Sequence, residues 1–267
     1  MDSVPSGDSV VYLYGIVPSG QLMPAREGAS AADVTLPSLA ALADLLPADG
    51  FSGAALETRL QDIGWVSAQA RLHTAVLGQA MEHGPVVPAH LCTLFSSTGA
   101  LRDFLERNED QLRQTLERLR GRREWGLKLF CDESRVRASC LASDPDLCEI
   151  ASPAGAVSAG AAWMQRKRRD TLLAERVADR IEQAADAVFG ELADAAADVR
   201  VRPPLSEATS GVPEPMVLNA ALLVDVGAEA ALHATLENLG SALEHDGYRL
   251  VLSGPWPPFS FSEEGAS

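Results

Sequence analysis

The chain has 267 residues, of which 46% are hydrophobic and 22% charged, a composition typical of folded globular proteins rather than disordered chains. Its net charge of −15 repels phosphate backbones and anionic lipid surfaces, which argues against nucleic-acid binding as the main activity. Four cysteines without a CxxC pair exclude a disulfide scaffold and lack the spacing of a common zinc site.

The N-terminus and the hydropathy pattern bear on where the protein works. Residues 1–5 are acidic and precede no long apolar core, so no signal peptide is predicted. No stretch approaches 18 uninterrupted apolar residues, so no membrane span is predicted either. We therefore expect a cytoplasmic protein with reduced thiols.

The first half of the chain mixes strand and helix patterns. Residues 9–17 are rich in β-branched and aromatic side chains and predict a strand, and 18–37 predict a loop. Residues 38–46 place leucines at helical spacing in a segment as short as a strand, so both remain open. A helix is predicted over 65–81, and an extended piece over 86–95.

A further helix is predicted before the middle of the chain. Ser97 is a candidate N-cap, an apolar stripe runs from Leu101 to Leu119, and Gly121 is a candidate C-terminal stop. We place the boundary of the first domain at this glycine. The sequence thus predicts an N-terminal α+β domain over residues 1–121 and a second domain over 122–267.

The second half has a more regular order. Residues 132–157 are predicted to be irregular, and the carboxylates of Asp144 and Asp146 to be solvated there. The predicted strands cover 124–131, 199–202, 216–226 and 248–252. The predicted helices cover about 157–197, with a kink or break in the N-terminal third, and 228–243. The resulting β-α-β-β-α-β order predicts a modified ferredoxin-like fold, an antiparallel sheet with two helices on one face.

The sequence lacks the common catalytic and cofactor motifs. It has no GxSxG elbow, no HExxH, no P-loop and no GxGxxG after a strand. His73 borders an apolar helix face and is interpreted as a packing residue. His83, His90 and Cys92 are separated by prolines that keep them from converging on a metal. We therefore predict no catalytic, cofactor-binding or metal-binding residues, and no enzyme.

Two segments are candidates for partner binding. Arg166, Lys167, Arg168 and Arg169 form the single basic cluster of an acidic chain, either a solvated helix turn or a docking patch for an acidic surface. The second segment follows the last strand. Its proline-rich run carries Trp256, Phe259 and Phe261, and would either seal its own domain or present a rigid aromatic hook.

Several segments, in matching order, resemble the GvpL/GvpF family of gas vesicle proteins. The most specific is the tail Ser253–Phe261; the others are Val11–Val17, Arg71–His73 with the helix after it, Glu124–Lys128 and Leu218–Val224. The resemblance covers residues 9–261. One departure is clear, because the family's usual Pro-Leu-Arg-Phe-Gly-Thr-Val-Phe reads Pro-Ala-His-Leu-Cys-Thr-Leu-Phe over residues 88–95, with His90 and Cys92 in place of arginine and glycine.

The resemblance implies two α+β domains, the second ferredoxin-like, and a minor non-enzymatic protein needed for gas vesicle assembly. It implies association with gas vesicles and binding of the small hydrophobic shell protein GvpA and other gas vesicle proteins. An acidic protein that covers an apolar patch would act as a chaperone for shell subunits. The alternatives are a ligand-sensing regulatory module and an enzyme, because ferredoxin-like domains serve both.

Overall fold

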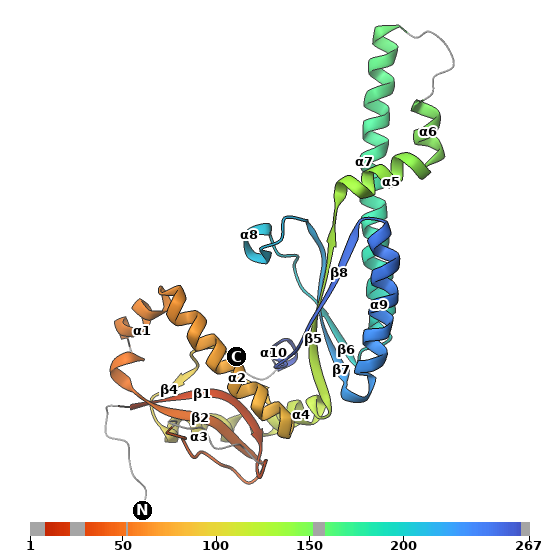
Figure 1. Cartoon of the computed structure of the whole chain (residues 1–267). Coiled ribbons are helices and arrows are strands. Elements are labelled where there is room, and N and C mark those ends of the chain that lie inside the picture. Colours follow the sequence, from red (N-terminus) through yellow and green to blue (C-terminus); the bar gives the residue numbers. More distant parts are fainter. Residues whose placement is uncertain (1–8, 22–29, 52, 152–157, 263–267) are drawn as a thin grey trace, which may run out of the picture. The chain divides into compact units, whose positions relative to one another are not determined.

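The computed structural model describes residues 9–21, 30–51, 53–151 and 158–262, and it mixes helices with strands (Figure 1). The chain divides into two compact units. The first contains Met1–Glu124 and Pro255–Ser267, and the second contains Trp125–Gly254. The division near residue 124 lies close to the boundary at Gly121, but the tail packs with the first unit, whereas the sequence assigned it to the second domain.

The first unit is built on a sheet whose central strand is β1 (Ser9–Pro18). It pairs antiparallel with β2 (Leu39–Pro47), β3 (Val87–Pro88) and β4 (Leu94–Phe95). The segment that was compatible with helix or strand is thus a strand, because it pairs with β1 along its whole length. Short-range helical spacing of leucines is overridden when a long neighbouring strand offers backbone partners.

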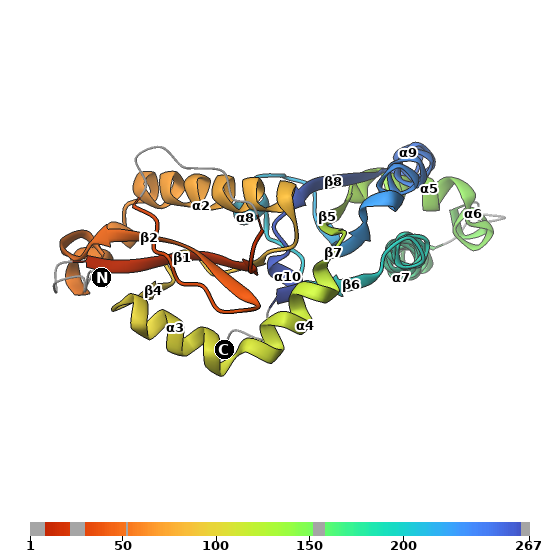
Figure 2. The same ribbon diagram turned by 90° about the horizontal axis from the view of Figure 1, so that it is seen from below.

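Helices cover both faces of this sheet. Figure 2 shows α2 (Ile63–His83) on one face and α3 (Thr98–Arg107) and α4 (Glu109–Leu119) on the other. This explains why β1 is buried from Val11 to Val17, where both sets of alternating side chains meet a helix. The remaining short elements of the unit are η1 (Ala48–Gly50), α1 (Gly53–Leu60) and α10 (Phe259–Ser262).

Local signals set the ends of these helices. The Asp62 carboxylate accepts from the backbone N–H of Gly64 and Trp65 and starts α2. The predicted N-cap, Ser97, accepts from Ala100 N–H and starts α3. The helix predicted to run on to residue 119 is two helices instead. Asn108 ends the first by donating its side-chain amide to Phe104 O, at 2.8 Å.

Close packing around β1 depends on Gly15. The register of β1 against β2 shifts between Leu13 and Gly15, which marks a bulge. A Cβ atom on Gly15 would lie 2.8 Å from the backbone oxygen of Val87 and 3.0 Å from Leu77 Cδ2. The missing side chain therefore lets β3 and α2 approach the central strand.

Cys92 occupies a backbone conformation that favours glycine. Its φ is 62°, and no other non-glycine residue of the described chain has a positive φ. This is the position at which the resembled family has glycine. The left-handed region costs a residue with a Cβ roughly 1–2 kcal/mol, partly offset by the larger unfolded-state entropy of glycine.

We therefore expect Cys92→Gly to raise the free energy of unfolding by about 0.5–1 kcal/mol. Cys92→Ala is the matched control, because it removes the thiol while retaining the Cβ. The alanine variant should not gain this stability in urea unfolding. Equal stability of the two variants would show that the strain at this position is negligible.

The second unit contains a four-stranded sheet in the order β6-β7-β5-β8. The strands are β5 (Arg122–Cys131), which begins just before the division, β6 (Asp198–Val201), β7 (Met216–Asp225) and β8 (Tyr248–Trp256). β7 is buried on both faces from Leu218 to Val224, which explains its nearly continuous apolar sequence. The long helices α7 (Ala159–Ala193) and α9 (Glu229–His245) lie beside each other along the sheet (Figure 1).

Three predictions for this unit were wrong. Residues 133–151 are not irregular but form α5 (Glu133–Ser143) and α6 (Pro145–Ala151). The long helix α7 has no break over its 35 residues, because it contains no proline; its buried apolar stripe, which includes Leu173, Val177 and Val188, begins after the part in which the break was predicted. Last, β8 continues through Pro255. This is possible because β8 is an edge strand, where a missing N–H can face away from the sheet.

The connections around β7 include two short helical elements. These are α8 (Glu207–Ser210), within the segment predicted as a loop, and η2 (Val226–Ala228) before α9. Residues 22–29 of the first predicted loop, and residues 152–157 before α7, lie outside the described chain.

Candidate functional site

The site begins with the helix α6, which a salt bridge fixes against α7. The Asp144 carboxylate caps α6 by accepting from the N–H of Asp146 and Leu147 at 3.0 and 3.1 Å. Arg176 on α7 then pairs with Asp144 at 2.9 Å and with Asp146 at 3.1 Å. Leu147 is buried in the core, so α6 is held by both packing and charge.

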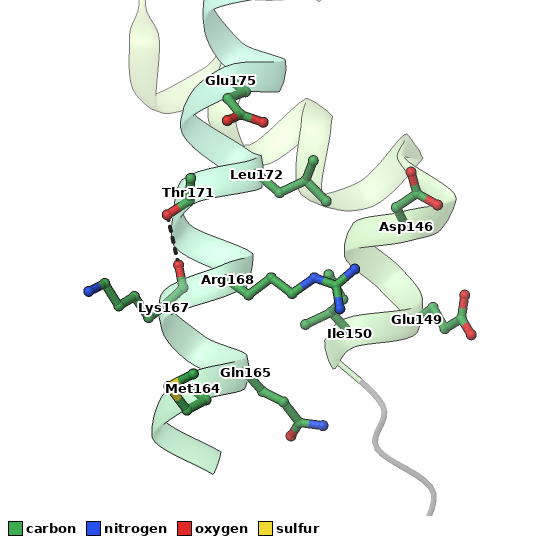
Figure 3. A pocket seen from close by; sticks show the side chains of 10 residues that line it. All are labelled: Asp146, Glu149, Ile150, Met164, Gln165, Lys167, Arg168, Thr171, Leu172 and Glu175. Carbon is green, nitrogen blue, oxygen red and sulfur yellow. Dashed lines mark hydrogen bonds between the residues drawn. The ribbon is translucent and has the colours of Figure 1, made fainter. Parts of the chain in front are cut away.

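Between α6 and α7 lies a groove with a volume of about 860 Å³. We call it the α6–α7 groove. Figure 3 shows Ile150 on α6 facing Leu172 and Arg168 on α7. The full lining is Asp146, Glu149, Ile150, Met164, Gln165, Lys167, Arg168, Thr171, Leu172 and Glu175.

The basic cluster lies on α7 at this groove. Arg166, Lys167 and Arg168 are exposed and Arg169 is half-buried. Lys167 and Arg168 line the α6–α7 groove. Lys167 and Arg166 also line a second hollow of about 690 Å³ on the other flank of the helix. The cluster is therefore a partly exposed patch with a depression on each side.

Two large apolar side chains are exposed next to the cluster. Trp163 is 54% exposed and Met164 62% exposed. The Lys167 ammonium lies 5.4 Å from the centroid of the Trp163 ring, within cation–π range. Exposed tryptophan beside positive charge is a frequent composition of protein-binding surfaces.

The aromatic residues of the tail have different surroundings from one another. Phe261 is completely buried, and its carbonyl oxygen accepts from the Arg118 guanidinium. Phe259 stacks on His73, with ring centroids 6.3 Å apart. Trp256 is 45% exposed. The structure thus brings Phe259 and Phe261 into the packing of the first unit, whereas the basic cluster belongs to the second unit.

His73 belongs to a buried polar network, which agrees with its interpretation as a packing residue. Its Nε2–H donates to Ala89 O at 3.0 Å, because a carbonyl can only accept. Its Nδ1 therefore accepts from the Tyr12 hydroxyl at 2.9 Å, and that hydroxyl accepts from Cys92 N–H at 3.1 Å. Every polar atom of the neutral ring is satisfied.

We expect this network to make stability depend on pH. Burial, with a smaller contribution from His90, lowers the pKa of His73 from its ordinary 6.5. The stability contribution is therefore complete above pH 6.5 and falls as the unfolded chain takes up a proton below it, by at most about 1.4 kcal/mol per pH unit. Urea unfolding between pH 7.5 and 5 measures this loss.

His73→Gln should remove this part of the acid-side loss, so the stability gap between wild type and variant narrows as the pH falls. His83 is the control, because it is exposed on the same helix and its Nδ1 bonds only to its own helix at Gln79 O. The His83→Gln variant should keep the wild-type pH dependence. If His73→Gln left the pH dependence of the free energy of unfolding unchanged, the His73 ring would not be the source of the acid-side loss.

Over residues 9–21, 30–51, 53–151 and 158–262, no three His, Cys, Asp or Glu side chains gather as metal ligands would. Within the same ranges, no helix combines the length and the hydropathy needed to cross a bilayer.

The family model for gas vesicle synthesis protein GvpL/GvpF matches residues 10–263. The chain belongs to the GvpL/GvpF family. It is 33% identical to gas vesicle protein L of Streptomyces sp. strain CB03234, over 96% of this chain and 94% of that protein. It is 24% identical to gas vesicle protein L1 of Halobacterium salinarum, over 76% of this chain and 73% of that protein.

Solved structures of the family share the fold. Gas vesicle protein GvpF from Anabaena sp. PCC7120 superposes with a TM-score of 0.70 at 20% identity, covering 96% of this chain and 98% of that one. GvpF from Microcystis aeruginosa gives a TM-score of 0.65 at 18% identity, covering 95% and 99%. The resemblance stated from the sequence is therefore confirmed, and it places this chain among gas vesicle proteins.

Sequence reasoning missed the α6 side of the groove. Asp144 followed by Pro145 is a helix-start signal, an N-cap and a proline at the first helical position, and it would have located α6. With α6 treated as irregular, Ile150 had no place opposite α7. Trp163 and Met164 had a signal of their own, since they lie three and two residues before the start of the basic cluster.

Proposed function

We propose that this chain is a non-enzymatic assembly protein that binds the hydrophobic shell protein GvpA and holds it in soluble form until it joins the growing vesicle. The family match across residues 10–263 carries this proposal. The net charge of −15 suits a partner that keeps an apolar subunit dispersed. The work would take place in the cytoplasm, in association with gas vesicles and their other proteins.

The basic cluster and Trp256 are the residues we assign to partner contact. The exposure of Arg166, Lys167 and Arg168 supports their part, and the half-exposed ring of Trp256 supports the tail's part. Phe261 has no surface to offer a partner, so we give Phe259 and Phe261 the task of anchoring the tail.

We also propose that the second unit is a modified ferredoxin-like domain. The sheet order β6-β7-β5-β8 supports this assignment, because the first and third strands in sequence are the central pair. The inserted helices α5 and α6 are then the modification, and they form one wall of the α6–α7 groove.

Co-expression with the shell protein tests the holding role. The soluble fraction of GvpA should rise when this chain is present, and the two should co-purify. An unrelated protein of similar size and charge is the control for non-specific effects. Equal GvpA solubility with and without this chain would rule out the chaperone function. A metabolite that binds with a defined stoichiometry in calorimetry would favour the ligand-sensing alternative.

A further inference from the structure

We propose that the α6–α7 groove binds an amphipathic helix of a partner protein, with an apolar ridge in the groove and acidic side chains along the edge that faces α7. The proposal rests on the assembly function and adds the surface and the chemistry of the partner. The α7 wall runs from Met164 to Glu175, about three helical turns or roughly 17 Å.

The geometry of the groove favours a helix as the occupant. Met164, Arg168 and Leu172 line the groove at steps of four residues, which is the row of side chains that ridge-into-groove packing uses between helices. Ile150 completes the apolar part from α6 (Figure 3). A helix laid in such a groove would present apolar residues at spacings of three and four.

The charges on the two walls of the groove differ, so they determine which edge of a bound helix should be acidic. The α7 wall carries Lys167 and Arg168 near its start and Glu175 at its far end, whereas the α6 wall carries Asp146 and Glu149. Asp146 is already paired with Arg176. An occupant is therefore matched when its acidic side chains lie beside Lys167 and Arg168 on α7, with none opposite Glu149 or Glu175.

The cations of the cluster are available to a partner. Arg176 and Arg180, further along α7, bind Asp144, Asp146 and the hydroxyls of α5. In the described part of the chain, no carboxylate pairs with Arg166, Lys167 or Arg168. In a protein of net charge −15, a local positive patch selects acidic partners and speeds their approach.

Exposed apolar side chains add a hydrophobic contribution to the electrostatic attraction between the groove and its partner. Met164 lines the groove and Trp163 lies one residue earlier, on the flank of the second hollow. Together they provide the type of anchor that carries most of the binding energy in protein interfaces. An anionic membrane is the less suitable occupant, because Asp170, Glu149 and Glu175 line the same two hollows and would meet lipid headgroups of like charge.

Photo-crosslinking in the full chain tests the proposal. The Gln165→p-benzoylphenylalanine variant, co-expressed with the other gas vesicle proteins including the shell protein, is irradiated and the linked peptide is sequenced by mass spectrometry. We expect a segment of a gas vesicle protein with apolar residues at spacings of three and four and with Asp or Glu along one edge. Crosslinks only to lipid, only to a second copy, to a segment without this pattern, or to nothing would overturn the proposal.

The linked segment is then synthesised, and its affinity is measured by fluorescence anisotropy at low and high salt. We expect K167E/R168E to weaken binding about tenfold or more at low salt, with a smaller difference at high salt. M164A should weaken binding about fivefold at both. The matched control is R71E/R107E, which reverses two exposed arginines of the first unit and should leave affinity within about twofold. Equal losses for both double variants would overturn the assignment to the groove.

The outcomes separate this proposal from the assembly function. Should K167E/R168E raise shell-protein solubility as well as the wild-type chain does, with no groove crosslink, the groove inference fails and the holding role stands. If the wild-type chain leaves the shell protein insoluble but the groove still crosslinks to an acidic helix, the holding role fails and the groove inference stands. If the wild-type chain bound phosphatidylglycerol vesicles but no peptide, and K167E/R168E abolished that binding, the occupant would be a membrane instead.

Discussion

Replacing Phe261 by alanine should lower the free energy of unfolding by about 3–5 kcal/mol, the cost of deleting a fully buried aromatic side chain. The ring has no exposed surface and lies in α10, which packs within the first unit. Such a loss is a large part of the 5–15 kcal/mol that stabilises an ordinary domain. Urea unfolding, followed by hydrogen exchange of the β1 amides, measures the effect on this unit.

The tail contains its own control. Trp256 is 45% exposed, so Trp256→Ala should cost much less, about 1 kcal/mol, and should leave β1 protected from exchange. If Trp256→Ala destabilised the chain as strongly as Phe261→Ala, the tail would be anchored at its start rather than at α10. A stable Trp256→Ala variant that no longer binds the partner would support a hook function for that ring alone.

The tail also shows how far sequence reasoning could go. Proline-rich composition and three aromatic residues marked residues 253–261 as a special segment, and the two uses considered were sealing a domain and binding a partner. Which unit the tail packs with could not be derived from it. Phe259 meets His73, a partner 186 positions earlier in the chain, and no local pattern encodes a contact of that range.

Strands with long neighbours and helices with a clear apolar stripe could be predicted. The elements at β1, α2, β5, β7 and α9 agree with the apolar periodicity, since each buries a continuous face. Apolar periodicity could not reveal the α5–α6 pair, because α6 has only seven residues and, among those whose burial is described, one fully buried anchor, Leu147; the Asp144-Pro145 signal marks only where α6 begins. Its position depends on the ion pairs of Arg176, which are tertiary contacts.

The candidate site also has one part that could be predicted from the sequence and one part that could not. The basic cluster was evident as a deviation from the acidic composition, and the structure places it on the surface of α7. The groove beside it was not, because a groove needs two walls and the second wall is α6. The basic cluster could be derived from the sequence, whereas the groove beside it depends on how α6 packs against α7.

The last prediction concerns the buried carboxylate that holds the tail. Glu124 is buried, and its Oε2 accepts from the Ser260 N–H at 2.8 Å while its Oε1 accepts from the Ser260 hydroxyl. Replacing Glu124 by alanine leaves both donors without these acceptors in a dry environment. We expect a loss of about 3 kcal/mol in the free energy of unfolding, because hydrogen bonds to a charged group are stronger than neutral ones.

A double-mutant cycle with Ser260→Ala distinguishes this contact from general damage. Ser260→Ala removes only the hydroxyl donor, so its combination with Glu124→Ala should cost less than the two single losses together, by about 1 kcal/mol. Ser143→Ala, on α5 of the second unit, is the independent reference, and its effect should add to that of Glu124→Ala. Full additivity with Ser260→Ala would mean that the hydroxyl bond to Glu124 contributes no stability, which would leave the Ser260 N–H bond and the buried ring of Phe261 as the anchors of α10.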